Sequence, residues 1–351
     1  MTEGQTPGAL APASTWKRRC TAVRRLIGDT PLLQLRCRLL GEERTVYAKL
    51  ETLNLTGSIK DRMALHVLET AYTENAVRPG DVIAEATSGN TGIALAAVGR
   101  ALGHSVRIFM PDWMSTERKQ LIRSMGAEVV LVSAEEGGFI GAIERAEEYA
   151  RGRSGVFLSR QFDNQANPLA HFETTGPELV RQLEKLERAP TAFVAGVGTG
   201  GTVMGVGRYL RSRFADVTIH PLEPANSPTL RTGKKVGKHR IQGISDEFVP
   251  SIVRFDELDE IVDVWDGEAI IAAQRIAREL GLGVGISSGA NLLGALKVAL
   301  QQGPASTVVT VFPDSNKKYL STDLCNVEPE APEYLTRTLE FLGCDVLPGL
   351  R

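Results

Sequence analysis

The sequence is poor in cysteine and has no long apolar run. Its four cysteines, Cys20, Cys37, Cys325 and Cys344, form no CxxC pair, so the sequence predicts neither a zinc site nor a disulfide framework. The five histidines show no metal-ligand spacing, and we predict no metal. No window approaches the roughly 18 consecutive apolar residues of a membrane-spanning helix, so no membrane partner is expected. The first 19 residues lack the apolar core of a signal peptide, which together with reduced cysteines predicts a cytoplasmic protein.

A surplus of basic residues is also missing. Lysine and arginine number 40 and aspartate and glutamate 42, a net charge of −2, so we expect no nucleic-acid partner. Hydrophobic residues make up 42% and charged residues 23%, which excludes disorder for most of the chain. Glycine, in contrast, is plentiful: 35 of 351 residues, about 10% compared with a usual share of about 7%. This surplus predicts places where the backbone turns sharply or approaches a ligand.

Short apolar runs alternate with longer helical patterns from about residue 25. The runs cover residues 45–51, 81–87, 105–111, 127–133, 155–162, 191–198, 217–224 and 306–314. Nearly continuous apolar runs are typical of parallel strands buried on both faces, so the predicted fold class is α/β. Ligands of such sheets bind beyond the carboxyl ends of the strands, and the segments that follow the runs hold most of the glycines.

The glycine-rich segment 196–210, GVGTGGTVMGVGRYL, follows one predicted strand and begins a predicted helix. Consecutive glycines let backbone N–H groups converge on an anion, and the helix start adds the positive end of its dipole. The hydroxyls of Thr199 and Thr202 add further donors. The segment is therefore predicted to bind phosphate rather than to form a turn without a ligand.

A dinucleotide site is the main alternative for this segment. Gly196, Gly198 and Gly201 satisfy the GxGxxG pattern, and Glu223 ends the next predicted strand, about where such a site places its ribose-binding acid. On that interpretation the protein is an NAD-dependent oxidoreductase. A third possibility is a non-catalytic protein that only binds a phosphate ligand. Against the dinucleotide site, the pattern lies beyond the middle of the chain, and a second glycine loop is left unexplained.

The second glycine loop, within 85–103, again joins a predicted strand to a predicted helix. The side chains of Thr87, Ser88, Asn90 and Thr91 place hydroxyl and amide donors at the helix start, where a small carboxylate would bind. An N-cap without a ligand is the alternative on local grounds.

Lys60 lies in the first turn of a predicted amphipathic helix, after a candidate N-cap, Ser58. A cation is disfavoured at a helix N-terminus, and the same field lowers the pKa of a lysine toward the neutral amine that forms an imine. A phosphate site, a carboxylate site and such a lysine together predict pyridoxal phosphate acting on an amino acid.

With these features the chain resembles the cysteine synthase (O-acetylserine sulfhydrylase) and cystathionine β-synthase family of pyridoxal phosphate enzymes. The resemblance covers about 300 residues, in the family's order. Its motifs are IGDTPLLQL (27–35), GSIKDR (57–62), TSGNTG (87–92), QFDNQANPLAHFETTGPE (161–178), GVGTGGT (196–202), HRIQGI (239–244), GISSGAN (285–291) and YLST (319–322). It implies fold type II, tryptophan synthase β-like, with two three-layer α/β/α lobes and a cleft between them.

The resemblance also implies a domain organisation. We expect a flexible N-terminal tail at 1–22, a smaller mobile substrate-binding lobe at 32–53 and 67–164, and a larger cofactor-binding lobe at 23–31, 54–66 and 165–326. Residues 327–351 are expected to form a C-terminal extension, an acidic linker followed by one short helix.

Roles for individual residues follow from the same resemblance. Lys60 is expected to be the Schiff-base lysine that also moves the Cα proton. Asn90 is expected to contact the ring hydroxyl of the cofactor, and Ser287 its pyridine nitrogen. The phosphate would be held by Gly198, Thr199, Gly200, Gly201 and Thr202, and the substrate by Thr87, Ser88, Gly89, Thr91, Gln161 and Gly243.

The implied reaction is a β-replacement on O-acetyl-L-serine or O-phospho-L-serine through an α-aminoacrylate intermediate. Sulfide is the simplest nucleophile and would give L-cysteine. Another nucleophile would give a β-substituted alanine, as in diaminopropionate-type or ureidoserine-type synthesis. The partners are then a small amino-acid substrate and a small nucleophile, and the resemblance implies a homodimer.

The chain departs from the family pattern beside the expected cleft. Arg160 stands where the family usually has glutamine, and Ser245, Asp246 and Glu247 replace a glycine and alanine loop. The segment 314–318 also differs. Drift at loop tips is one explanation. The other is substrate specificity: Arg160, or Lys317 and Lys318 of that segment, would favour an anionic donor. Asp246 and Glu247 would favour a cationic nucleophile.

Overall fold

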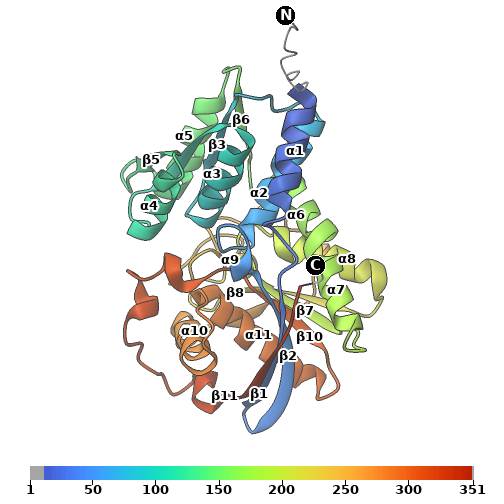
Figure 1. The fold of residues 1–351 in the computed structure, drawn as a ribbon. Coiled ribbons are helices and arrows are strands. Elements are labelled where there is room, and N and C mark those ends of the chain that lie inside the picture. Colours follow the sequence, from blue (N-terminus) through green and yellow to red (C-terminus); the bar gives the residue numbers. More distant parts are fainter. Residues whose placement is uncertain (1–11, 350–351) are drawn as a thin grey trace, which may run out of the picture.

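The computed structural model describes residues 12–349, which form two α/β parts, each built around one sheet (Figure 1). The larger sheet has the strand order β11-β1-β2-β10-β7-β8-β9. From β2 to β9 neighbouring strands are parallel, whereas β1 pairs antiparallel with β2 and β11. Its strands are β1 (Leu32–Leu39), β2 (Glu42–Leu50), β7 (Ala192–Gly196), β8 (Thr218–Pro224), β9 (Val262–Val264), β10 (Val308–Phe312) and β11 (Glu340–Leu347).

The smaller sheet is parallel throughout and has the order β5-β4-β3-β6. Its strands are β3 (Val82–Ala86), β4 (Ser105–Pro111), β5 (Glu128–Val132) and β6 (Val156–Leu158). Every apolar run that the sequence singled out overlaps a strand. Most of these strands are buried on both faces of a sheet, where residues are almost all apolar. The predicted α/β fold class is confirmed.

Helices cover both faces of each sheet. In the larger part, α10 and α11 pack on one face and α7 and α8 on the other. In the smaller part, α1, α2 and α3 pack on one face and α5 on the other. The helices are α1 (Pro12–Arg24), α2 (Lys60–Thr73), α3 (Asn90–Leu102), α4 (Thr116–Ser124), α5 (Gly138–Ala150), α6 (Ala166–Ala170), α7 (Gly176–Glu184), α8 (Gly201–Arg213), α9 (Thr229–Thr232), α10 (Asp266–Leu280) and α11 (Ile286–Gln302). A π-helical turn, His171–Thr175, joins α6 to α7.

Three predictions about the domain organisation are wrong. Residues 12–22 are not a tail: they belong to α1, whose Trp16 stacks on Tyr72 of α2 and whose Cys20 is buried. Residues 1–11 lie outside the described part. β1 and β2 were assigned to the smaller lobe, yet both pair within the larger sheet. The C-terminal extension ends in strand β11 rather than in a helix.

Within residues 12–349, no helix is both long and apolar enough to cross a membrane. No cluster of three or more His, Cys, Asp or Glu side chains in that range is arranged to hold a metal ion. All four cysteines are free.

Candidate active site

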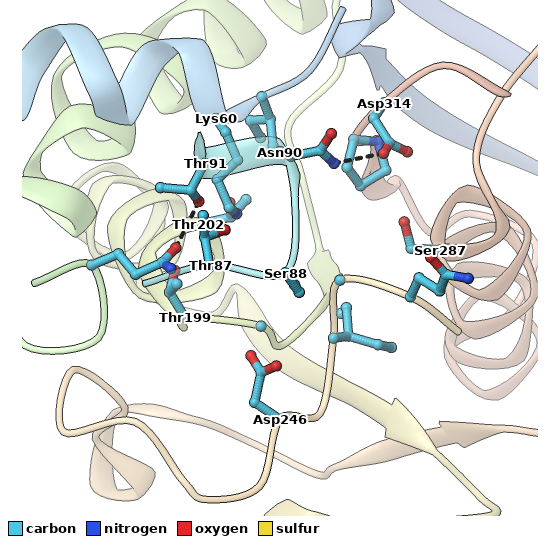
Figure 2. A pocket seen from close by; sticks show the side chains of 18 of the residues that line it. Lys60, Thr87, Ser88, Asn90, Thr91, Thr199, Thr202, Asp246, Ser287 and Asp314 are labelled. Atoms are coloured by element: carbon cyan, nitrogen blue, oxygen red, sulfur yellow. Dashed lines mark hydrogen bonds between the residues drawn. The ribbon is translucent and has the colours of Figure 1, made fainter. Parts of the chain in front are cut away.

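A cavity at the carboxyl ends of the parallel strands of both sheets collects the segments that the sequence singled out. Its walls include the first turns of α2, α3, α8 and α11, and Figure 2 shows their side chains from close by. The predicted residues that line it are Lys60, Thr87, Ser88, Asn90, Thr91, Gln161, Gly198, Thr199, Gly200, Gly201, Thr202, Gly243, Asp246 and Ser287. Residues far apart in the sequence thus share one site, as the position of ligand sites in parallel sheets predicts.

Lys60 is the first residue of α2 and points into this cavity. Burial lowers the pKa of its amine below the usual value, while the nearby carboxylates of Asp314 and Asp246 raise it again. The pKa of Lys60 is thus lowered, as the sequence predicts. The main cause is desolvation, whereas the sequence analysis expected the helix dipole to be the cause. Ser58 is not the N-cap, because Ile59 holds that position without a side-chain cap.

Buried ion pairs fix the first turn of α2. Arg62, two residues after Lys60, pairs with Glu51 at 2.7 Å and with Glu178 at 2.7 Å, and Lys49 also pairs with Glu178 at 2.9 Å. All four side chains are buried. This network, which joins β2, the turn after it, α2 and α7, anchors the backbone that carries Lys60.

The turn before α8, which the sequence predicts to bind phosphate, lies in the cavity wall. Gly200 has a φ of +84°, which favours glycine, and it caps the helix. A Cβ on Gly198 would come within 2.4 Å of the carbonyl oxygen of Gly243, and one on Gly201 within 2.0 Å of Asn167 Oδ1. Asn167 donates a hydrogen bond to the Thr199 hydroxyl at 2.9 Å. Its role was not apparent from the sequence, because Asn167 precedes Thr199 by 32 residues.

The geometry does not favour a dinucleotide site. Glu223 is 1% exposed and accepts a hydrogen bond from the backbone N–H of Leu230 at 2.6 Å. It also pairs with Arg231 at 3.2 Å. This carboxylate therefore closes the turn after β8 and is not available to a ribose.

The β3–α3 loop, which the sequence predicts to bind a carboxylate, also lines the cavity. The Thr91 hydroxyl donates to Gln161 Oε1 at 2.6 Å, and Gln161 Nε2 donates to the carbonyl oxygen of Ala86 at 2.8 Å. Beneath the loop, Glu85 accepts from the backbone N–H of Gln161 at 3.0 Å, and burial raises the pKa of Glu85 to about 7. Gly89 does not line the cavity. The side chain of Arg118 fills the space where a Cβ on Gly89 would lie.

Asn90 and Ser287 face the cavity near Asp314 (Figure 2). Asn90 Nδ2 donates to Asp314 Oδ2 at 2.6 Å, and the Tyr319 hydroxyl donates to the same oxygen. Asn90 Oδ1 and Asp314 Oδ1 are buried without a partner. These two oxygens are therefore available as hydrogen-bond acceptors to a group bound in the cavity.

The specificity candidates separate into two groups. Arg160 is wrong as an entrance residue: it lies on the surface, where its guanidinium makes two 2.8 Å hydrogen bonds to Glu147 of α5. Ser245 and Glu247 lie outside this cavity but line the larger space next to it, on the side of the predicted entrance. The Ser245 hydroxyl donates to Thr229 Oγ1 at 2.9 Å, and Glu247 pairs with Lys235 at 2.5 Å.

Asp246 is the candidate that the structure places in the cavity (Figure 2). Burial raises the pKa of its carboxyl to about 6, against the opposing effect of Lys60. The preceding residue, Ser245, has a φ of +54°, a conformation that is rare outside glycine. Backbone in that region is held by its surroundings and is frequent at functional sites.

These residues fit pyridoxal phosphate. Thr199, Gly200, Gly201 and Thr202 would hold its phosphate, and Lys60 its reactive carbon. The Asn90 side chain, whose Oδ1 has no partner, and the Ser287 hydroxyl would face its ring. A family model described as pyridoxal-phosphate dependent enzyme matches residues 23–314. Fold and site together thus define a pyridoxal-phosphate dependent enzyme of fold type II.

Individual relatives narrow the class. The probable cysteine synthase of Bacillus subtilis (strain 168) is 45% identical over 300 residues, 85% of this chain and 96% of that protein. The crystal structure of a hydrogen sulfide-producing enzyme from Fusobacterium nucleatum is 52% identical, with a TM-score of 0.92 over 95% of this chain and 99% of that one. The crystal structure of an O-ureido-L-serine synthase is 39% identical, with a TM-score of 0.78 over 89% of this chain and 96% of that one. The chain belongs to the cysteine synthase and cystathionine β-synthase family, as predicted, and is an enzyme of β-replacement or lyase chemistry.

Proposed function

We propose that the protein catalyses β-replacement on an O-activated L-serine, with sulfide as the simplest nucleophile and L-cysteine as the product. The observation that carries this proposal is the position of Lys60 between the phosphate cradle and the β3–α3 loop in one cavity. An amino acid whose carboxylate binds Thr87, Ser88 and Thr91 would have its Cα near the Lys60 amine.

Pyridoxal phosphate, when bound, withdraws electrons from Cα and so makes the Cα proton acidic and the Cβ substituent able to leave. The chain's own residues supply the rest. The Lys60 amine, whose pKa is lowered by burial, accepts the Cα proton and later returns it. Gln161 holds Thr91 in the orientation that faces the substrate carboxylate. Ser287 presents a neutral hydroxyl to the ring nitrogen, which does not enforce its protonation as a carboxylate would.

The donor is tested by incubating the holoenzyme with sulfide and either O-acetyl-L-serine or O-phospho-L-serine, and measuring L-cysteine. We expect cysteine from at least one of the two donors. Equal and fast formation from both would contradict a specialised donor, and no cysteine from either would contradict the proposed reaction.

A second candidate function is release of hydrogen sulfide from L-cysteine, with water or a thiol as the incoming nucleophile. The observation that favours it is Asp246, an acid that faces Lys60 in the cavity. A neutral nucleophile must lose a proton as it attacks Cβ, and a carboxylate with a pKa near 6 accepts that proton at neutral pH. A relative that is 52% identical is itself a hydrogen sulfide-producing enzyme.

Replacing Asp246 with asparagine should therefore slow addition of a neutral thiol such as 2-mercaptoethanol by about 10²-fold. In the unchanged enzyme this rate should fall as the pH drops through about 6, because Asp246 becomes protonated. The fall should be absent in Asp246→Asn, as measured by the pH profile of thioether formation. The rate of hydrosulfide addition should change little in Asp246→Asn, because hydrosulfide is already an anion and has no proton to lose before it attacks.

Asp256→Asn, a change at an exposed carboxylate of the larger part, is the matched control and should leave both rates unchanged. A pH profile that keeps its acid limb in Asp246→Asn would show that another group accepts the proton.

We also propose that the enzyme is a cytoplasmic homodimer. Four free cysteines agree with a reducing compartment. Pro168, Leu169 and Phe172 line an apolar depression beside α8, and Leu169 is 39% exposed. A second copy of the chain would cover this surface, and light scattering would report the mass of the assembly.

A further inference from the structure

Arg118 lies at the junction of the inner cavity with a larger outer chamber. It belongs to the first turn of α4, is 3% exposed and lines both spaces. The outer chamber has a volume of about 660 Å³, and its walls include Trp113, Met114 and Asp246. A group that leaves or enters at the substrate Cβ therefore passes this guanidinium.

The charge of Arg118 has no carboxylate partner among the described residues. Its Nε is buried without a hydrogen bond, and Nη1 has only two long contacts, 3.5 Å to the carbonyl oxygen of Ser88 and 3.8 Å to Met114 Sδ. The guanidinium also stacks on the ring of Tyr319, 4.6 Å from its centre, and interacts with the hydroxyl of that residue, which is a neutral partner. Arg62, equally buried, pairs with two carboxylates. A buried cation without an anionic partner is costly, so this arrangement is one that an anion would complete.

The other cations of the outer chamber are already neutralised. Lys235 pairs with Glu247 at 2.5 Å, and Arg240 pairs with Glu328 at 2.6 Å. Burial lowers the pKa of the His239 imidazole, which disfavours its charged form. Arg118 is thus the cation of this chamber that lacks a carboxylate partner among residues 12–349.

We propose that Arg118 binds an oxyanion, phosphate or carboxylate, carried by the group that leaves or enters at Cβ. This inference rests on the proposed β-replacement. Arg118 would then bind the anionic group that the sequence analysis had assigned to Arg160, whose side chain lies on the surface. The planar guanidinium matches both oxyanions with two parallel hydrogen bonds.

The size of the chamber supports a substituent larger than sulfide. One water molecule occupies about 30 Å³, and hydrosulfide is of the same order. A chamber of about 660 Å³ is more than twenty times larger. It has room for a phosphate leaving group or for a nucleophile that bears a carboxylate.

Two assays with the holoenzyme distinguish the two sources of the oxyanion. The donor assay compares O-phospho-L-serine with O-acetyl-L-serine at fixed sulfide. The nucleophile assay compares 3-mercaptopropionate with 2-mercaptoethanol at fixed O-acetyl-L-serine. In Arg118→Gln, kcat/KM should fall about tenfold or more for the anionic member of one pair, because one charge-assisted hydrogen bond is lost. For the neutral member of that pair, kcat/KM should change little. Arg118→Lys keeps the positive charge but cannot make two parallel hydrogen bonds, so its kcat/KM for the anionic compound should lie between those of the unchanged enzyme and Arg118→Gln.

Arg123→Gln is the matched control, because Arg123 lies on the same helix and is exposed. It should behave as the unchanged enzyme in both assays. Equal losses for all four compounds in Arg118→Gln, or no loss for any, would overturn the proposal and leave Arg118 as a support of Ser88 and Gly89.

Anion binding gives a readout that does not depend on turnover. The holoenzyme is titrated calorimetrically with inorganic phosphate and, separately, with 3-mercaptopropionate. In the holoenzyme the cofactor already fills the phosphate cradle, so a bound anion must lie elsewhere. We expect one of the two anions to bind. Its dissociation constant should rise about tenfold or more in Arg118→Gln and not in Arg123→Gln. If the unchanged enzyme performs no β-replacement with any compound, the proposed function fails, and this titration alone decides whether Arg118 binds an anion. Binding that is the same in all three proteins, or absent from all, contradicts the proposal.

Discussion

Replacing Lys60 with alanine is expected to abolish covalent attachment of the cofactor and to lower β-replacement by at least about 10³-fold. In the proposed function Lys60 has two tasks, holding the reactive carbon of the cofactor and moving the Cα proton, and proton transfer alone contributes about 10²–10⁴-fold. No other lysine lines the cavity among the described residues. The measurements are the absorption band of the bound cofactor near 410 nm, roughly, and the rate of cysteine formation.

The cofactor should still bind to Lys60→Ala without a covalent bond, because the cradle of Thr199 to Thr202 does not involve the lysine. Lys317→Ala, at an exposed lysine three residues after Asp314, is the control and should retain the band and the activity. A colourless protein that binds NAD, or a Lys60→Ala variant with full activity, would refute the assignment.

The segments at strand ends were predictable because their chemistry is local. The phosphate turn before α8 and the loop before α3 each contain glycine, hydroxyl residues and a helix start within a few positions, and the fold brings both to one cavity. The same local pattern made Glu223 a plausible ribose ligand. Only the fold shows that the carboxylate of Glu223 is used by the turn that follows it.

Residues that act through distant partners were not predictable in this way. Asn167 reaches Thr199, and Arg118 fills the space beside Gly89, although each pair is about 30 residues apart in the sequence. Arg160 was misassigned because its neighbour Gln161 lies in the site. A φ of +49° at Arg160 accompanies a side chain that pairs with α5 rather than facing the cleft. Neighbours along a chain need not share a face.

Strand β11 was also not predictable from its own residues. β11 pairs with β1 across about 300 residues, and its partly exposed residues lack the continuous apolar run of a central strand. An edge strand of this kind is recognised by its partner rather than by its own pattern. The buried network around Arg62 is likewise made of charged residues that, in sequence, look like surface positions.

That network gives the largest expected effect on stability. Replacing Glu178 with glutamine should destabilise the fold by about 3–5 kcal/mol, because Arg62 and Lys49 would stay buried with one carboxylate, Glu51, for two cations. The two cations hold the pKa of Glu178 well below its usual range, so its charge stabilises the folded state at neutral pH. This contribution is present above the usual pKa of a glutamate and is lost as the pH falls through the depressed value. Urea unfolding of the holoenzyme at pH 7.5 measures the change.

Glu184→Gln provides the matched control on the same helix, α7. Glu184 is exposed and pairs with Arg213 at 3.8 Å, so its replacement should cost no more than about 0.5 kcal/mol. The Glu178 variant should also lose activity beyond its loss of stability, because Arg62 is two residues from Lys60 and anchors the turn that carries it. If both variants unfold at the same urea concentration, the buried pairs do not stabilise the fold. Full activity of a folded Glu178→Gln protein would show that the position of Lys60 is set by packing alone.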